Sequence, residues 1–281
     1  MGKTVTIRVA HSPDSDDAFM FYGLASNKVA TGDRRYVHEL SDIESLNQRA
    51  LRCELDVSAV SIHAYAYLAN DYALLSSGAS MGNRYGPRLV ANSPPPADVR
   101  EAIKNKRIAI PGKLTTAHLV LRLFQPDIEA VEMPFDQIME SVSREEVDAG
   151  LIIHEGQLTY GTSNLHLWLD TGEWWWEETG LPLPLGGNVV RRDLGGELVS
   201  KISDDLRASI VYGLDHREEA LTYALQYARG LNRAEADEFV KMYVNEYTVD
   251  YGEDGKSAVR LLLERAAAAG IIPSAPTVEF V

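Results

Sequence analysis

The sequence predicts an α/β protein of two lobes, joined by two crossings of the chain and separated by a cleft. Strand patterns alternate with helix patterns in the first part of the chain, and the alternation starts again after a proline-rich segment. A second break rich in proline and glycine ends this middle section, and from Glu197 onward the sequence reads almost entirely as amphipathic helix. With 281 residues, the chain is long enough for two lobes of ordinary domain size.

The first lobe shows a β-α-β-α order, which predicts a parallel sheet covered by helices. Ser15 or Asp16 is placed to cap the first helix, and Ser41 with Glu44 forms a capping box for the second. Strands are expected at residues 5–9, 57–61, 72–77 and 88–92, and helices at residues 16–26, from the capping box to about 52, and 63–68.

The middle section repeats this order and the last section returns to the first lobe. Strands are expected at residues 107–110, 130–133, 150–154, 166–169 and 188–191, and helices at about 115–124, 135–142, 197–213, 216–229, 234–246 and 253–269. The long helical tail has no sheet of its own, so it must pack on an earlier lobe. We therefore expect a large lobe of residues 1–92 and 188–281, a small lobe of residues 97–185, and crossings near 93–96 and 186–188. Clefts between lobes are the usual place for small-molecule sites.

Charge and composition narrow the class of partner. The chain has 27 Lys and Arg against 41 Asp and Glu, a formal charge of −14, which argues against nucleic acid or an anionic membrane as partner. An anionic small molecule stays possible, because a local pocket can be positive on an acidic protein. The N-terminal residues lack the apolar core of a signal peptide and no apolar run is long enough to span a membrane, so we expect a cytoplasmic protein. The lone cysteine, Cys53, cannot form an intrachain disulfide, and nothing in the sequence marks it as a nucleophile.

The segment from Ala149 to Glu155 is the strongest candidate for chemistry. An apolar run typical of a strand ends on His154, and strand ends are where open α/β sheets present groups to ligands. Imidazole exchanges a proton near neutral pH, although a hydrogen-bonded histidine of the core would give the same pattern. Strand alternation puts Glu155 on the opposite face from His154, so Glu155 is not automatically its partner.

A second strand end, Pro111 to His118, opens a helix with Thr115 and Thr116. Hydroxyls and free amides at a helix start suit a carboxylate or phosphate, and a simple threonine cap is the alternative. The order of glycine and lysine differs from that of a P-loop.

Three further motifs carry weaker signals. The acidic turn from His11 to Asp17 fails as a calcium loop, although His11 with one aspartate would leave a transition-metal site open. Gly78 to Gly82 matches the G-x-S-x-G pattern of hydrolases, but Gly-Pro follows where a helix is required, so we interpret it as a chance match in a loop. Residues 174–176 are three tryptophans, which either pack in the core or close over an aromatic ligand.

Several segments together resemble one family. These are residues 9–22, 42–47 (Asp-Ile-Glu-Ser-Leu-Asn), 59–61 (Ala-Val-Ser), 111–117 (Pro-Gly-Lys-Leu-Thr-Thr-Ala) and 150–155 (Gly-Leu-Ile-Ile-His-Glu), in that order along the chain. The sequence resembles the 1,4-dihydroxy-6-naphthoate synthases of the futalosine route to menaquinone, over nearly its whole length. The resemblance implies a fold like that of type II periplasmic binding proteins, and lyase activity on cyclic dehypoxanthine futalosine without cofactor or metal.

The resemblance also implies roles for particular residues. His154 matches the family's general base. The positions that contact ligand match Ala59, Val60, Ser61, Thr116 and Ala117, with Asn47 also at the cleft. At the first turn the family often reads Ser-Pro-Cys-Pro-Asn-Asp, where this chain reads Ser-Pro-Asp-Ser-Asp-Asp, so the acidic turn is a departure.

The function expected from the sequence is therefore that of a carbon–carbon lyase acting on a carboxylated small molecule. Two alternatives stay open: a cytoplasmic carboxylate-binding protein or sensor on the same fold, and an eliminase like chorismate dehydratase. The sister dehydratases share the fold but are not expected to carry the His-Glu pair at 154–155. The sequence leaves the oligomeric state undetermined.

Overall fold

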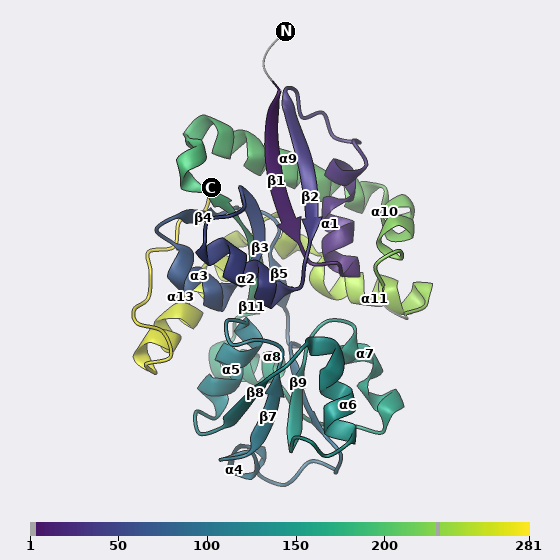
Figure 1. Ribbon diagram of the computed structural model, residues 1–281, viewed down its shortest axis with the longest axis vertical. Helices are drawn as coiled ribbons and strands as arrows, with labels where there is room; N and C mark the ends of the chain where they lie inside the picture. The colour runs from purple at the N-terminus through teal and green to yellow at the C-terminus, as the bar shows by residue number, and fades with distance from the viewer. Residues whose placement is uncertain (1–3, 229–230) are drawn as a thin grey trace.

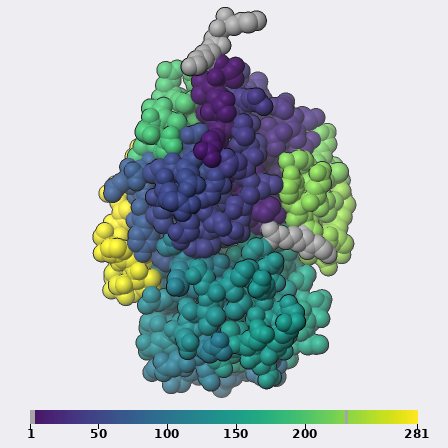
Figure 2. Space-filling view, in the orientation of Figure 1, coloured from purple at the N-terminus to yellow at the C-terminus, as the bar shows by residue number. Residues whose placement is uncertain are grey.

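The protein forms two α/β lobes, each built around its own mixed sheet (Figure 1). The computed structural model describes residues 4–228 and 231–281. Strand β1 (Val5–His11), near the start of the described chain, and the C-terminus lie on the large lobe, and the small lobe is formed by the middle of the chain (Figure 1). The surfaces of the two lobes meet along a seam in the space-filling view (Figure 2). No helix among the described residues is long and apolar enough to cross a membrane.

The large lobe contains a six-stranded sheet in the order β2-β1-β3-β11-β4, with β5 also paired to β11. Strands β1, β2 and β3 run parallel, whereas β11 runs antiparallel to β3, β4 and β5. The strands are β1 (Val5–His11), β2 (Arg34–Leu40), β3 (Val57–Ser61), β4 (Tyr72–Leu74), β5 (Ser80–Gly82) and β11 (Leu183–Arg191).

Helices cover both faces of this sheet, because successive side chains of a buried strand point to opposite faces. Val189 of β11 packs in the core beneath α3 and α13, while its neighbour Val190 packs in the core beneath α1 and α9 to α11. The helices are α1 (Ser15–Ala25), α2 (Ile43–Leu51), α3 (Ile62–Leu68), α9 (Gly196–Asp215), α10 (Arg217–Ala224), α11 (Arg233–Tyr243), α12 (Glu246–Val249) and α13 (Gly252–Ala268). The C-terminal helices thus complete the large lobe, as expected from the sequence.

The small lobe contains a five-stranded sheet in the order β10-β6-β9-β7-β8. Its strands are β6 (Arg88–Ala91), β7 (Arg107–Ile110), β8 (Glu129–Glu132), β9 (Ala149–Ile152) and β10 (His166–Asp170). The helices are α4 (Val99–Ala102), α5 (Thr116–Phe124), α6 (Ile138–Ser143), α7 (Gly156–Thr159) and α8 (Thr171–Thr179). Leu89 and Val90 of β6 point into two different cores, one on each face of the sheet.

The lobe boundaries differ from those expected. Strand β6 pairs with β9 and β10, so residues 88–91 belong to the small lobe and the first crossing precedes them, at residues 83–87. The proline run at 94–96 is a connection inside the small lobe. Leu183 already pairs with Gly82 in the large sheet, so the chain returns at residues 180–182 and not at 186–188. Pro184 is accommodated in β11 beside a register irregularity, where a missing N–H is tolerated.

Other expectations were wrong in detail. The sheets are mixed and not purely parallel, because β11 re-enters the large sheet antiparallel to β3. The second helix is capped by Asp42, whose side chain accepts from the Ser45 N–H at 3.0 Å, and not by a Ser41–Glu44 box. Strand β2 and helix α8 had no predicted counterpart. The helix expected over 216–229 ends at Ala224, and residue 229 lies outside the described residues.

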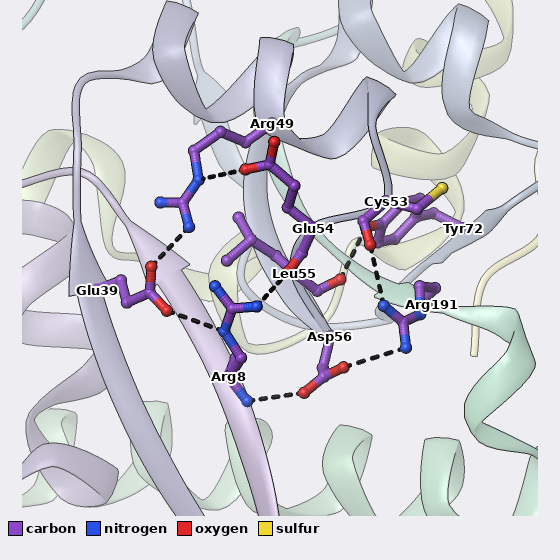
Figure 3. Close-up of polar contacts among 9 residues, drawn as sticks. All are labelled: Arg8, Glu39, Arg49, Cys53, Glu54, Leu55, Asp56, Tyr72 and Arg191. Carbon is purple, nitrogen blue, oxygen red and sulfur yellow. Dashed lines mark hydrogen bonds and ion pairs between the residues drawn. The ribbon is translucent and has the colours of Figure 1, made fainter.

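A network of arginines and carboxylates joins the strands of the large sheet and helix α2 (Figure 3). Glu39 of β2 accepts from Arg8 of β1 at 3.0 Å and from Arg49 of α2 at 2.6 Å. Asp56 accepts from the Arg8 backbone N–H at 2.9 Å and pairs with Arg191 of β11 at 3.4 Å. We call these residues, with Glu54, the arginine network. They tie together segments that lie far apart in the sequence.

Candidate active site

A cavity lies between the two lobes, which is a usual place for a small-molecule site. Its walls are formed by strand ends, helix starts and one helix of the C-terminal region. The lining residues include Ser12, Asp14, Asp16 and Asp17 after β1, Ala59, Val60 and Ser61 at the end of β3, Thr115, Thr116 and Ala117 at the start of α5, Ile153, His154 and Gln157 after β9, Leu185 to Asn188 on β11, and Phe239 and Tyr243 on α11. The carboxyl ends of the parallel strands thus open onto the cavity, as in other α/β proteins.

The structure brings six of the seven predicted site residues to this cavity. Ala59, Val60, Ser61, Thr116, Ala117 and His154 all line it. Asn47 does not, because it is fully buried behind Ser61. Its Nδ2 donates to the Ser61 Oγ at 3.2 Å, and its Oδ1 accepts from the Ser61 N–H at 2.9 Å. Since Asn47 occupies an acceptor position of the Ser61 hydroxyl, the Ser61 O–H is left to donate into the cavity.

The start of α5 forms a neutral wall with Ser61. Thr115 is the N-cap, and its hydroxyl accepts from the His118 N–H at 3.3 Å. Thr116 Oγ1 donates to the Leu185 carbonyl at 2.6 Å and accepts from the His63 N–H at 3.2 Å, so its side chain joins the two lobes. Backbone N–H groups in the first helical turn have no acceptor within the helix. This wall therefore offers N–H and O–H donors to a ligand.

A close approach between the lobes lies beside this wall. The Leu114 N–H donates to the Glu44 carboxylate of α2 at 3.1 Å. A Cβ on Gly112 would lie 2.3 Å from the same carboxylate, so only glycine admits this contact. The two lobes are thus in direct contact at the α5 side of the cavity.

His154 stands two residues after the end of β9, and its backbone has φ +58°, in the left-handed region. This conformation interrupts the alternation of the strand, so the face expected from the sequence does not apply. The Nδ1 of His154 lies 2.8 Å from Oδ2 of Asp14, and its ring packs edge-on against Phe135 at 4.8 Å between centroids. Among the described residues, the buried Nε2 has no hydrogen-bond partner.

Asp14 belongs to the turn between β1 and α1, and it is buried. It is the N-cap of α1, but its side chain makes no capping hydrogen bond. A capping aspartate ordinarily contributes about 1 kcal/mol to helix stability. Here the carboxylate instead accepts from the Ser12 hydroxyl and contacts His154. The Asp14 carboxylate therefore lies beside His154 and does not cap helix α1.

The other carboxyls of the turn are also perturbed. The Ser12 N–H donates to Asp17 at 2.7 Å. Burial, then the charge of Asp14, raises the pKa of Asp17 to about 7. Burial and the charges of Asp17 and Asp14 raise the pKa of Asp16 well above its usual range. The Ser15 hydroxyl donates to Glu155 at 3.4 Å, another contact between the lobes. Groups that hold protons near neutral pH are therefore concentrated around His154.

The charge state of His154 follows from the same neighbours. Burial alone lowers the pKa of His154, but the carboxylate of Asp14, with Glu155 and Asp16 behind it, outweighs burial and raises this pKa to about 9. In the ligand-free protein at neutral pH, His154 is protonated and paired with Asp14. It becomes a proton acceptor once that proton leaves.

Sequence reasoning missed Asp14 as the partner of His154, although the departure of the acidic turn from the family pattern was the available signal. His11, considered as a metal ligand, instead stacks on Phe21 and contacts His38 at 3.3 Å. Burial and then the charge of His38 lower the pKa of His11 to about 3. Among the described residues, no group of three or more His, Cys, Asp or Glu side chains could hold a metal ion.

The remaining motifs have structural places. Ser80 of the G-x-S-x-G match lies on strand β5 and not in a loop, and it also lines the cavity. The three tryptophans lie on α8, where Trp175 is fully buried and donates to the Pro182 carbonyl at 3.2 Å. Cys53 lies at the arginine network, and burial raises the pKa of its thiol, which disfavours the reactive thiolate.

Comparison with known proteins places the chain in a family. A family model described as menaquinone biosynthesis matches residues 7–268. A 1,4-dihydroxy-6-naphthoate synthase of Streptomyces coelicolor is 40% identical over 275 residues, covering 96% of this chain and 95% of that protein. A protein of the same name from Thermus thermophilus is 38% identical over 275 residues, covering 98% of this chain and 99% of that protein.

Solved structures agree on the fold. An X-ray structure of a protein from Archaeoglobus fulgidus matches with a TM-score of 0.90 and 48% identity, covering 95% of this chain and 98% of that one. The alkanesulfonate-binding protein SsuA of Xanthomonas axonopodis pv. citri, bound to MOPS, matches with a TM-score of 0.71 over the full length of both chains. At 13% identity, this second likeness shows the fold alone, which is that of periplasmic binding proteins. With a family model over most of its length and two such relatives, the chain belongs to the menaquinone biosynthesis family.

Proposed function

We propose that the protein is a 1,4-dihydroxy-6-naphthoate synthase, a lyase that cleaves cyclic dehypoxanthine futalosine with His154 as general base. Its membership of the menaquinone biosynthesis family and its two synthase relatives support the reaction. The observation that carries the role of His154 is its place in the interlobe cavity, with Nδ1 on a carboxylate and Nε2 left without a partner among the described residues.

The proposed chemistry is a proton abstraction followed by carbon–carbon cleavage. His154 Nε2 removes a proton from the sugar-derived part of the substrate, and formation of the aromatic naphthoate drives the cleavage. A positioned general base contributes about 10²- to 10⁴-fold to such a step. Nδ1 keeps its contact with Asp14 throughout, so the positive charge that forms on the ring is balanced at 2.8 Å.

The two walls of the cavity suggest how the substrate lies. The Ser61 hydroxyl and the first N–H groups of α5 attract a carboxylate, whereas the carboxyls of the acidic turn do not. The substrate carboxylate therefore binds at the neutral wall, and the sugar-derived part points toward His154. Asn47 contributes indirectly by holding Ser61.

The direct test is to incubate the purified protein with cyclic dehypoxanthine futalosine and measure 1,4-dihydroxy-6-naphthoate by mass spectrometry. Product from the wild type and its loss in His154→Gln are expected. No product from a folded wild type would overturn the reaction, and full activity in the variant would overturn the role of His154.

The same assay separates the two alternatives. Turnover of chorismate would indicate an eliminase, and thermal stabilisation by a carboxylate without turnover would indicate a binding protein or sensor. The cytoplasmic location stays a prediction, to be tested by cell fractionation.

A further inference from the structure

The contact between Asp14 and His154 crosses from one lobe to the other. Asp14 lies on the turn between β1 and α1 of the large lobe, while His154 follows β9 of the small lobe. Their Oδ2 and Nδ1 atoms are 2.8 Å apart, a hydrogen-bond distance. The side chains are 1% and 15% exposed, so water does not weaken the contact.

Local geometry on both sides serves this contact. Asp14 is the N-cap residue of an 11-residue helix, yet its carboxylate does not cap that helix and is held by the Ser12 hydroxyl. His154 is held in the left-handed backbone conformation, in which residues other than glycine are uncommon. Two unfavourable local arrangements, one in each lobe, thus coincide at one hydrogen bond. Such outliers justify a functional hypothesis.

We propose that Asp14 is the positioning residue of His154: from the opposite lobe, its carboxylate accepts the Nδ1–H of His154, fixes the ring and its tautomer, and leaves Nε2 for the substrate. The proposal rests on the proposed function for the identity of the substrate. The hydrogen bond and its effect on His154 can be tested without any substrate.

Several acidic groups face His154, and they must be distinguished. Asp14, Asp16 and Asp17 face it from the turn and first residues of α1, and Glu155 adjoins it in the chain. The Oδ2 of Asp14 lies at hydrogen-bond distance from the ring, 2.8 Å from Nδ1. Both the hydrogen bond and the charge of Asp14 favour the protonated ring, whereas Asp16 acts by charge alone. Removing Asp14 therefore lowers the basicity of His154 more than removing Asp16 does.

The test is an NMR titration of the full chain labelled with ¹⁵N-histidine. The chain has 7 histidines, and the His154 signals are those absent from His154→Gln. In the wild type we expect His154 to titrate near pH 9. In Asp14→Asn, which keeps the size of the side chain, we expect a fall of about two pH units, because burial is then opposed only by the weaker charges of Glu155 and Asp16. The matched control Asp16→Asn removes one charge from the same turn and shifts the titration by less than about one unit.

Two titration results would overturn the proposal: a wild-type His154 that titrates at or below pH 6.5, or an equal shift in Asp14→Asn and Asp16→Asn. Because no substrate is used, this arm stands whether or not the synthase assay succeeds. If Asp14→Asn does not fold, the ring ¹⁵N shifts of the wild type still decide: the proposal requires the proton of the neutral ring on Nδ1, and a proton on Nε2 would overturn it.

Kinetics supply a second readout. In the wild type, the limb of kcat/KM that reports the free base rises about tenfold for each pH unit up to about 9. In Asp14→Asn this limb moves to lower pH, and the plateau of kcat falls roughly 10- to 100-fold because the ring is no longer oriented. A lower kcat with an unmoved limb would mean that Asp14 has a merely structural role and would overturn the proposal.

Discussion

The large lobe carries two clusters of charge that behave in opposite ways. In the arginine network, hydrogen bonds from Arg49 and Arg8 lower the pKa of Glu39, so this carboxylate stays ionised and paired (Figure 3). In the acidic turn, burial and like charge raise the pKa values of Asp16 and Asp17, and neither forms an ion pair with a lysine or arginine of the described residues. The two clusters lie close together in the sequence: Arg8 of the arginine network is on β1, and the acidic turn directly follows this strand.

The difference separates structural from functional charge. Paired carboxylates with lowered pKa values stabilise a fold, whereas carboxyls driven toward the neutral form cost stability and persist where a reaction uses them. The arginine network joins strands and lies outside the cavity, while the acidic turn lines it. The comparison predicts that substitutions in the turn change rate and pH dependence, and that substitutions in the network change only stability.

The largest effect is expected at the residue that the acidic turn serves. His154→Gln keeps a polar side chain but cannot take up a proton, so kcat should fall about 10²- to 10⁴-fold with little change in KM. Steady-state kinetics on cyclic dehypoxanthine futalosine measure this. A rise in KM at constant kcat would contradict it, because His154 would then contribute to binding and not to the chemical step.

A smaller effect, on binding, is expected at the neutral wall. Ser61→Ala removes a hydroxyl donor for the substrate carboxylate and should raise KM roughly tenfold, without moving the pH profile. Asn47→Ala should raise KM less, since it only releases Ser61 from its contacts at 3.2 and 2.9 Å. In the double variant the two effects should not add, because Asn47 acts through Ser61. Additive effects would mean that Asn47 has a separate role.

The two-lobe arrangement, and the strand ends that carry His154 and Thr116, could be predicted from local sequence patterns, whereas the other site residues followed only from the resemblance to the family. Alternating apolar residues marked β1, a short strand pattern marked β3 and an apolar run marked β9, and each of these strands ends at the cavity. The exact positions at which the chain passes between the lobes could not be predicted. The prolines at 94–96 indicate the end of an element, but they do not indicate which of the two sheets contains the preceding strand, β6. Only the pairing of β6 with β9, about 60 residues later, decides that.

The partner of His154 depends on the same kind of distant contact. Asp14 and His154 lie far apart in the sequence and in different lobes, and no spacing rule connects them. Their approach requires the left-handed backbone at His154, which the strand pattern does not predict. Likewise Asn47 was expected to contact ligand because of its place in the family pattern, whereas its side chain is used to hold Ser61.

A stability effect that depends on pH is expected at Asp17. The pKa of its carboxyl in the folded protein, about 7, is raised from the usual 3.8 by burial and then by Asp14, so folding favours the protonated form. Its contribution to stability is complete below about pH 4 and is lost as the pH rises through 7. The Asp17→Asn variant has no carboxyl to ionise, so it does not lose stability in this way. The difference in Tm between the variant and the wild type should therefore be larger at pH 8 than at pH 4, by at least about 2 °C in favour of the variant. Thermal unfolding followed by circular dichroism measures this, and a constant difference would contradict the raised pKa.

The smallest effect is expected in the arginine network, at Glu39. Its carboxylate pairs with Arg8 and Arg49 while 31% exposed, and partly exposed ion pairs contribute only about 0–1 kcal/mol. Glu39→Gln should therefore lower the free energy of unfolding by no more than about 1 kcal/mol, and less in high salt, because salt screens the pairs. Urea unfolding at two salt concentrations measures the change. The variant should keep the wild-type kcat and pH profile, since Glu39 lies at the arginine network and not at the cavity; a shifted pH profile would mean that the two clusters are electrostatically coupled and that the division between them is wrong.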